Sequence, residues 1–136
     1  MMMKLNHAVH NEELCRKLRA ENNFLDWVIT SAFYSALHYT EYELFPIQIG
    51  KRIYKDFDKY YEALKSSIDN KHYARQRLIY SDIAGAAGSA YHWLKDNCWS
   101  ARYYSYLVDE KNANIALEKL DIIKSYLSKP LTVQKF

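Results

Sequence analysis

The stretch from Lys71 to Arg77, KHYARQR, brings a histidine and two arginines close together. His72 and Arg75 are three residues apart, so on a helix they share one face. An imidazole beside a guanidinium can bind phosphate, because arginine holds two oxygens at once. Basic side chains are unfavourable at a helix N-terminus unless an anion lies close. We therefore expect either a carboxylate partner, such as Asp69 or Asp82, or a bound phosphate; the alternative is a solvated basic first turn.

A second basic residue lies among aromatic ones, in the stretch WSARYY. Arg102 is followed directly by Tyr103 and Tyr104 and preceded three positions earlier by Trp99. Such an arginine can stack on bases or hold a carboxylate. The alternative is an arginine at a helix C-terminus, where the helix dipole favours a positive charge.

A third set of residues repeats at helical spacing. Trp27, Tyr34, His38 and Glu41 follow one another at intervals of seven, four and three residues, so they share a face of one helix. Three interpretations are open: a core helix packed on both sides with His38 satisfied by a hydrogen bond, a dimer interface, or a ligand-binding or catalytic role for His38.

The N-terminal region offers a possible metal-binding pattern. His7, His10 and Glu13 lie three residues apart and could face one side of a helix. The rest of the sequence has no matching ExxH or HxxxH, and a chain end is a poor place for a metal site. We therefore expect solvated histidines here, no metal and no cofactor, and we keep a metal-binding bundle as an alternative.

The elements that must position these residues are predicted to be helices. Only 3 glycines and 2 prolines interrupt the chain, and no convincing period-2 strand appears. Apolar residues repeat at helical spacing in five regions: Val9–Glu21, Phe24–Phe45, Phe57–Ser66, 71–99 and Glu110–Leu127. We expect Asn22 and Asn23 to cap the second helix, and the run AGAAGSA (84–90) either to pack tightly or to kink its helix. The fold class is an all-α, antiparallel four- to five-helix bundle.

Size and composition set further limits. The 136 residues suit one domain, with a core over about 6–128 and a polar tail over 129–136. The two cysteines form no CxxC, and no apolar run approaches the roughly 20 residues that span a bilayer. We therefore expect reduced thiols, no membrane contact and a cytoplasmic location. The net charge of +3 permits an acidic partner without demanding one.

Four segments together resemble the HEPN superfamily, in particular its small bacterial members. They are HNEELCRKL, DWVITSAFYSALHYTEYEL, HYAR and YHWLKDNCWSARY, and they span about Asn6 to Tyr104. The resemblance implies a helical bundle that commonly dimerises. It also implies binding of RNA or nucleotides and, in many members, metal-independent ribonuclease activity in toxin–antitoxin and defence systems.

The nucleases of this superfamily share an Arg-x4–6-His pattern, which this chain lacks. No arginine has a histidine at that spacing, although Lys65 precedes His72 with six residues between them. The resemblance suggests six site residues in two roles. The expected catalytic residues are His72 as acid or base with Arg75 and Arg102 holding phosphate, and the expected ligand-binding residues are Tyr34, His38 and Tyr103.

These observations predict an RNA- or nucleotide-binding module that forms a homodimer. They also allow a weak or degenerate metal-independent ribonuclease activity. Two alternatives stay open. One is a non-catalytic interaction protein, such as the partner of a nucleotidyltransferase-like protein. The other is the metal-binding bundle with His7, His10 and Glu13.

Overall fold

The computed structural model describes residues 2–64 and 70–132. It contains six helices and one two-stranded antiparallel hairpin within those ranges. In chain order the elements are α1 (Met2–Glu21), α2 (Leu25–Leu44), β1 (Ile47–Ile49), β2 (Arg52–Tyr54), α3 (Phe57–Leu64), α4 (Lys71–Asp82), α5 (Gly85–Tyr103) and α6 (Glu110–Ser125).

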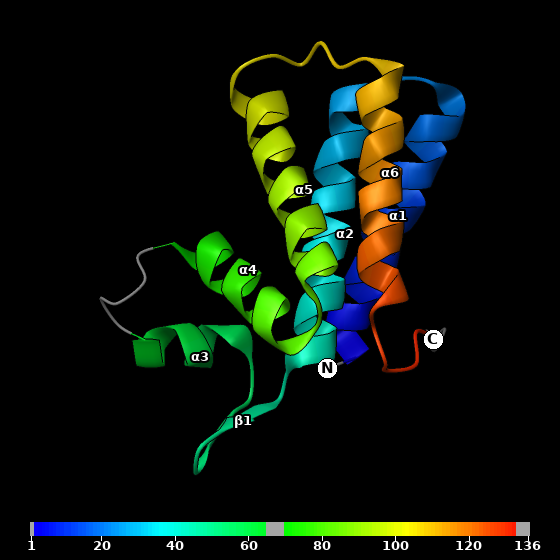
Figure 1. Ribbon diagram of the computed structural model, residues 1–136. Helices are drawn as coiled ribbons and strands as arrows, with labels where there is room; N and C mark the ends of the chain where they lie inside the picture. Colours follow the sequence, from blue (N-terminus) through cyan, green and yellow to red (C-terminus); the bar gives the residue numbers. More distant parts are fainter. Residues whose placement is uncertain (1, 65–69, 133–136) are drawn as a thin grey trace.

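The four long helices form an antiparallel bundle, as Figure 1 shows. α1 and α5 run in one direction, and α2 and α6 run in the other. The short helices α3 and α4 lie to one side, and the hairpin projects beyond the end of the bundle. The predicted all-α bundle is confirmed, although the described residues form six helices instead of four or five.

α2 is the central helix, because it packs against α1, α5 and α6. Its apolar stripe is buried, as predicted: Val28, Ile29, Ala32, Phe33, Ala36 and Leu37. Burying each of the larger side chains contributes about 1.5 to 3 kcal/mol, so this stripe is a main source of stability. Polar residues of α2 are also buried, including Thr40 and Glu41. Of the predicted set Trp27, Tyr34, His38 and Glu41, the packing around α2 therefore buries Glu41, whereas Trp27 is exposed.

The prediction that the chain has no strand is wrong. β1 and β2 pair over three residues each, from Ile47 opposite Tyr54 to Ile49 opposite Arg52. Gly50 makes the turn with φ +63°, a left-handed conformation that favours glycine. Strands of three residues are too short to show alternation, which is why the sequence pattern gave no signal.

Two predicted helix boundaries also need correction. α1 begins at Met2, seven residues before the predicted start at Val9. The cap of α2 is Phe24 in a left-handed conformation, with no side-chain capping bond. Asn23 accepts a hydrogen bond from the Phe24 backbone N–H instead of capping the helix. The predicted helix over Phe57–Ser66 is confirmed as far as Leu64, and Ser66 lies outside the described residues.

The small-residue run both breaks the helix and packs tightly. α4 ends at Asp82 and α5 begins at Gly85, so the chain turns within the run. Gly88 then lies directly against the ring of Tyr80: a Cβ added at Gly88 would be 2.6 to 2.8 Å from three ring carbons. The absence of a side chain at Gly88 is what allows α4 and α5 to approach here.

The start of the predicted tail is anchored to the end of α2. Lys129 Nζ donates hydrogen bonds to the carbonyls of Tyr42 and Phe45. The backbone N–H and hydroxyl of Ser128 donate to the Glu43 carboxylate. We call residues 128–130 the C-terminal strap. Residues 133–136 of the predicted tail lie outside the described residues.

No helix in the described ranges has the combination of length and hydrophobicity that crossing a membrane requires.

Candidate functional site

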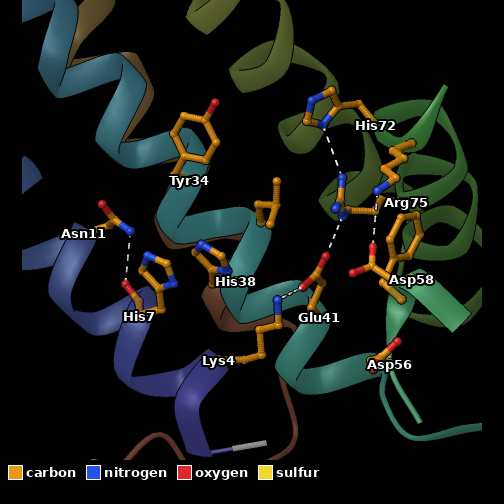
Figure 2. Close-up of a pocket in the computed structure, with 13 residues that line it drawn as sticks. Lys4, His7, Asn11, Tyr34, His38, Glu41, Asp56, Asp58, His72 and Arg75 are labelled. Atoms are coloured by element: carbon orange, nitrogen blue, oxygen red, sulfur yellow. Dashed lines mark hydrogen bonds and ion pairs between the residues drawn. The ribbon is translucent and has the colours of Figure 1, made fainter. Parts of the chain in front are cut away.

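The helices α1, α2 and α4 surround a hollow of about 620 Å³ beside the start of α3, shown in Figure 2. We call it the histidine pocket. Its lining includes Lys4, His7, Asn11, Tyr34, His38, Glu41, Phe57, Lys71, His72 and Arg75. The predicted site residues Tyr34, His38, His72 and Arg75 therefore come together here, from two helices that are far apart in the sequence.

A buried ion pair closes one side of the histidine pocket. Arg75 Nε donates to Glu41 Oε1 at 2.8 Å, with only 10% and 6% of the two side chains exposed. Lys4 Nζ lies 2.7 Å from the other oxygen of Glu41. The Arg75 guanidinium also lies 4.2 Å from the centre of the Phe57 ring. These contacts hold Arg75 in place without any ligand.

The carboxylate partner of Arg75 is thus Glu41, and the prediction of Asp82 is wrong. Asp82 instead accepts a hydrogen bond from the Ser81 hydroxyl. Asp69, the other predicted partner, lies outside the described residues, as does Lys65.

The Nδ1 atom of His72 has two neighbours in the protein. It lies 3.4 Å from Arg75 Nη1 and 3.3 Å from the hydroxyl of the buried Tyr91. Because a guanidinium can only donate, Nδ1 carries the lone pair and the neutral ring carries its proton on Nε2. Burial, Arg75 and Lys95 together lower the pKa of His72. At neutral pH His72 therefore presents an N–H donor at Nε2.

His38 is stacked on His7, with ring centres 3.9 Å apart and planes inclined by 15°. Its Nδ1 atom is buried and has no hydrogen-bond partner among the described residues. The interpretation of a His38 satisfied by a hydrogen bond is therefore wrong for this atom. Burial is the main cause that lowers the pKa of His38 to about 4, and the charges of His7 and Lys4 add to it.

This depressed pKa predicts a pH dependence of stability. Between pH 6.5 and 4 the unfolded chain protonates His38 and the folded chain does not, so the free energy of unfolding should fall as the pH falls. We expect a loss of stability between pH 6.5 and 5 in urea titrations, since carboxylates contribute little in that window.

The variants His38→Gln and His10→Gln separate the contribution of His38 to the pH dependence from the effect of replacing any histidine. His38→Gln should reduce the loss of stability, although His72 contributes in the same direction. His10→Gln, at an exposed position, is the control for replacing a histidine as such. Equal pH profiles for wild type and His38→Gln would contradict the prediction.

A second hollow, of about 460 Å³, lies between α2, α5 and the start of α4. We call it the aromatic pocket. Its lining includes Phe33, Tyr34, His72, Lys95, Asp96, Trp99, Arg102 and Tyr103. Arg102 Nη1 donates to the Tyr34 hydroxyl at 2.7 Å, and its guanidinium lies 5.2 Å from the centre of the Tyr103 ring.

All six predicted site residues therefore line one or both hollows. His38 and Arg75 line the histidine pocket, Arg102 and Tyr103 line the aromatic pocket, and Tyr34 and His72 line both. Trp27, from the same predicted stripe, lines neither; it is 52% exposed at the end of the bundle. Of the four stripe residues on α2, Tyr34 is thus the one shared by the two adjoining hollows, while His38 and Glu41 line the histidine pocket alone.

The two hollows differ in their charges. In the histidine pocket the cations Lys4, Lys71 and Arg75 each contact a carboxylate. In the aromatic pocket Lys95 lies 3.6 Å from Asp96. Arg102 contacts the Tyr34 hydroxyl and two tyrosine rings, and no carboxylate among the described residues pairs with it. Arg102 is therefore the better placed of these cations for an anionic ligand.

The described residues contain no group of three or more histidine, cysteine, aspartate or glutamate side chains placed to hold a metal ion. His7 faces the histidine pocket and stacks on His38, whereas His10 and Glu13 are exposed to solvent. The pattern that suggested a metal site does not bring its three residues together.

No protein-family model, curated protein or solved structure matches this chain. The resemblance to the HEPN superfamily therefore stays a prediction. A function for this chain has to be inferred from the residues that line the two hollows.

Several lining residues escaped the sequence reasoning. Lys4 and Asn11 come from α1, and Phe57 is the first residue of α3. Tyr91 of α5 lines neither hollow but supports His72. Lys4 and Phe57 belong to none of the patterns that suggested the site residues. Asn11 and Tyr91 lie within the segments HNEELCRKL and YHWLKDNCWSARY, but no spacing or residue type singled them out there. Glu41 did give a signal, because it continued the stripe of Trp27, Tyr34 and His38.

Proposed function

We propose that this chain is an RNA- or nucleotide-binding module, with the aromatic pocket as its binding site. The observation that supports this most directly is Arg102, which lies among Tyr34, Trp99 and Tyr103 without a carboxylate partner in the described residues. Aromatic rings stack on bases, and an unpaired guanidinium binds phosphate oxygens. The adjoining Nε2 N–H of His72 is a further donor for a phosphate or ribose oxygen.

The chemistry of His72 and Arg75 favours binding over cleavage. Activation of a ribose hydroxyl needs a base with a free lone pair. The lone pair of neutral His72 is at Nδ1, which faces Arg75 and Tyr91. Arg75 is committed to Glu41 and would have to leave a buried ion pair to hold a phosphate. We therefore propose that any metal-independent ribonuclease activity is weak.

The test is binding and cleavage of a mixed single-stranded RNA in the presence of EDTA. Wild type should bind, and higher salt should weaken the binding because phosphate contacts release counterions. Arg102→Ala should raise the Kd about tenfold, a loss of roughly 1.4 kcal/mol for one charge-assisted contact. Lys17→Ala, an exposed lysine on α1 outside both pockets, is the control and should leave the Kd unchanged.

Other outcomes point elsewhere. Cleavage that a His72→Ala/Arg75→Ala variant loses while still folded would establish a ribonuclease. A wild type that neither binds nor cuts RNA would contradict the proposal. The second candidate is then a protein-interaction module or homodimer, which is favoured by the large aromatic side chains exposed at one end of the bundle: Phe24, Trp27, Tyr103, Tyr104 and Tyr106.

A further inference from the structure

The exposed aromatic side chains gather where α2 begins and α5 ends, and both ends lie at the same side of the bundle in Figure 1. Between them is a third hollow of about 320 Å³, which we call the terminal groove. It is lined by Asp26, Trp27, Arg102, Tyr103, Tyr104 and Tyr106, among others. Trp27, Tyr104 and Tyr106 are 52%, 76% and 72% exposed. Rings this exposed do not contribute to the core, so packing does not explain them.

The terminal groove continues the aromatic pocket. Arg102 and Tyr103 line both hollows. The ring of Trp99, in the aromatic pocket, lies 4.8 Å from the ring of Tyr104, in the terminal groove. On α2, Trp27 lines the terminal groove and Tyr34 lines the aromatic pocket. The two residues are seven positions apart, which is about 10 Å along the helix axis. A ligand that filled both hollows would pass over Arg102.

We propose that the ligand is a single-stranded polynucleotide, one base of which occupies the aromatic pocket while the next occupies the terminal groove. This inference rests on the proposed function and names the class of ligand. Single strands are held by aromatic rings that stack on successive bases and by cations that follow the backbone. Arg102 lies between the two hollows, where the phosphate that links two such bases would pass.

The charge distribution supports a nucleic acid over a protein partner at this surface. The guanidinium of Arg102 contacts hydroxyl and ring groups, and no carboxylate in the described ranges forms an ion pair with it, although Asp26 lines the terminal groove and Asp96 the aromatic pocket. It is therefore open to a phosphate on the side shared by both hollows. A duplex hides the faces of its bases, so only an unpaired strand can use the exposed rings.

The experiment compares a fluorescent ten-nucleotide single-stranded RNA with AMP, for wild type and for Tyr104→Ala/Tyr106→Ala. Both tyrosines are exposed beyond the end of α5, so the variant should fold normally. The Kd for the ten-nucleotide RNA should rise about tenfold, within the range expected for losing a stacked base. The Kd for AMP should change by less than twofold, because AMP needs only the aromatic pocket. Tyr126→Ala, an exposed tyrosine at the other end of the bundle, should change neither value.

The outcomes distinguish this inference from the proposed function. If wild type binds AMP and RNA, and the double variant keeps the RNA affinity, the inference fails and the proposed function stands. If wild type binds neither ligand, the proposed function fails as well. A ten-base-pair duplex that binds as tightly as the single strand would also overturn the inference. So would a wild-type dimer that the double variant converts to a monomer with unchanged RNA affinity, because a second copy would then be the occupant.

Discussion

Replacing Arg75 with alanine is expected to lower the free energy of unfolding by about 3 kcal/mol, the lower end of the range for removing one partner of a buried ion pair. The Glu41 side chain, 6% exposed, would keep only the contact with Lys4, which is itself 41% exposed. The packing of the guanidinium on Phe57 would also be lost. Urea denaturation of wild type and variant measures this difference.

Arg16→Ala is the matched control for Arg75→Ala. Arg16 also contacts two carboxylates, on Glu12 and Asp121, but its side chain is 45% exposed. Its loss should cost about 1 kcal/mol or less, as expected for pairs in contact with solvent. A Glu41→Met/Arg75→Met variant should recover most of the stability, because neither charge is then left buried alone. Equal losses for Arg75→Ala and Arg16→Ala would contradict the prediction.

Gly88→Ala is expected to destabilise the protein by about 2 kcal/mol, as overpacking in a filled space does. The new Cβ would lie 2.6 Å from the first ring carbon of Tyr80, so rotating the ring about its own axis cannot relieve the overlap. Thermal or urea unfolding measures the loss. To accommodate the new Cβ, either α4 must move away from α5 or the Tyr80 side chain must give up its hydrogen bond with Ser89.

A second variant distinguishes this collision from a general effect of alanine in α5. Tyr80→Ala removes the ring, so adding Gly88→Ala to it should cost little or even stabilise the helix, since alanine favours helices over glycine. Gly85 gives the matched control, because a Cβ there would meet the Tyr80 ring at 3.8 Å, an ordinary contact. A loss at Gly88 that persists without the Tyr80 ring would contradict the argument.

The parts of the fold that sequence reasoning predicted are those that local patterns encode. The apolar stripe from Val28 to Leu37 repeats at helical spacing, so it identified α2 and its buried face. The hairpin was missed because its strands are shorter than any alternation that could reveal them. The left-handed Phe24 was missed because no local sequence preference favours that conformation at a bulky residue.

In the site, too, sequence reasoning found the residues that share one helix and missed the contacts between distant segments. Tyr34, His38 and Glu41 were grouped correctly because one helix carries all three. Their partners come from distant segments: Arg75 is 34 residues from Glu41, and Arg102 is 68 residues from Tyr34. Residue types suggested phosphate binding at Arg75, and base stacking or a carboxylate partner at Arg102. Only the fold shows that Arg75 forms a buried ion pair with Glu41, while no carboxylate in the described part of the chain forms an ion pair with Arg102.

The C-terminal strap has a consequence for the order of events during synthesis. The carbonyls of Tyr42 and Phe45 at the end of α2 are capped by Lys129, which lies 84 residues beyond Phe45. At typical translation rates these residues take about 4 to 17 seconds to add. The central helix of the bundle therefore has an uncapped end while α3 to α6 are being made on the ribosome. It gains its last hydrogen bonds only after the helices around it have been synthesised.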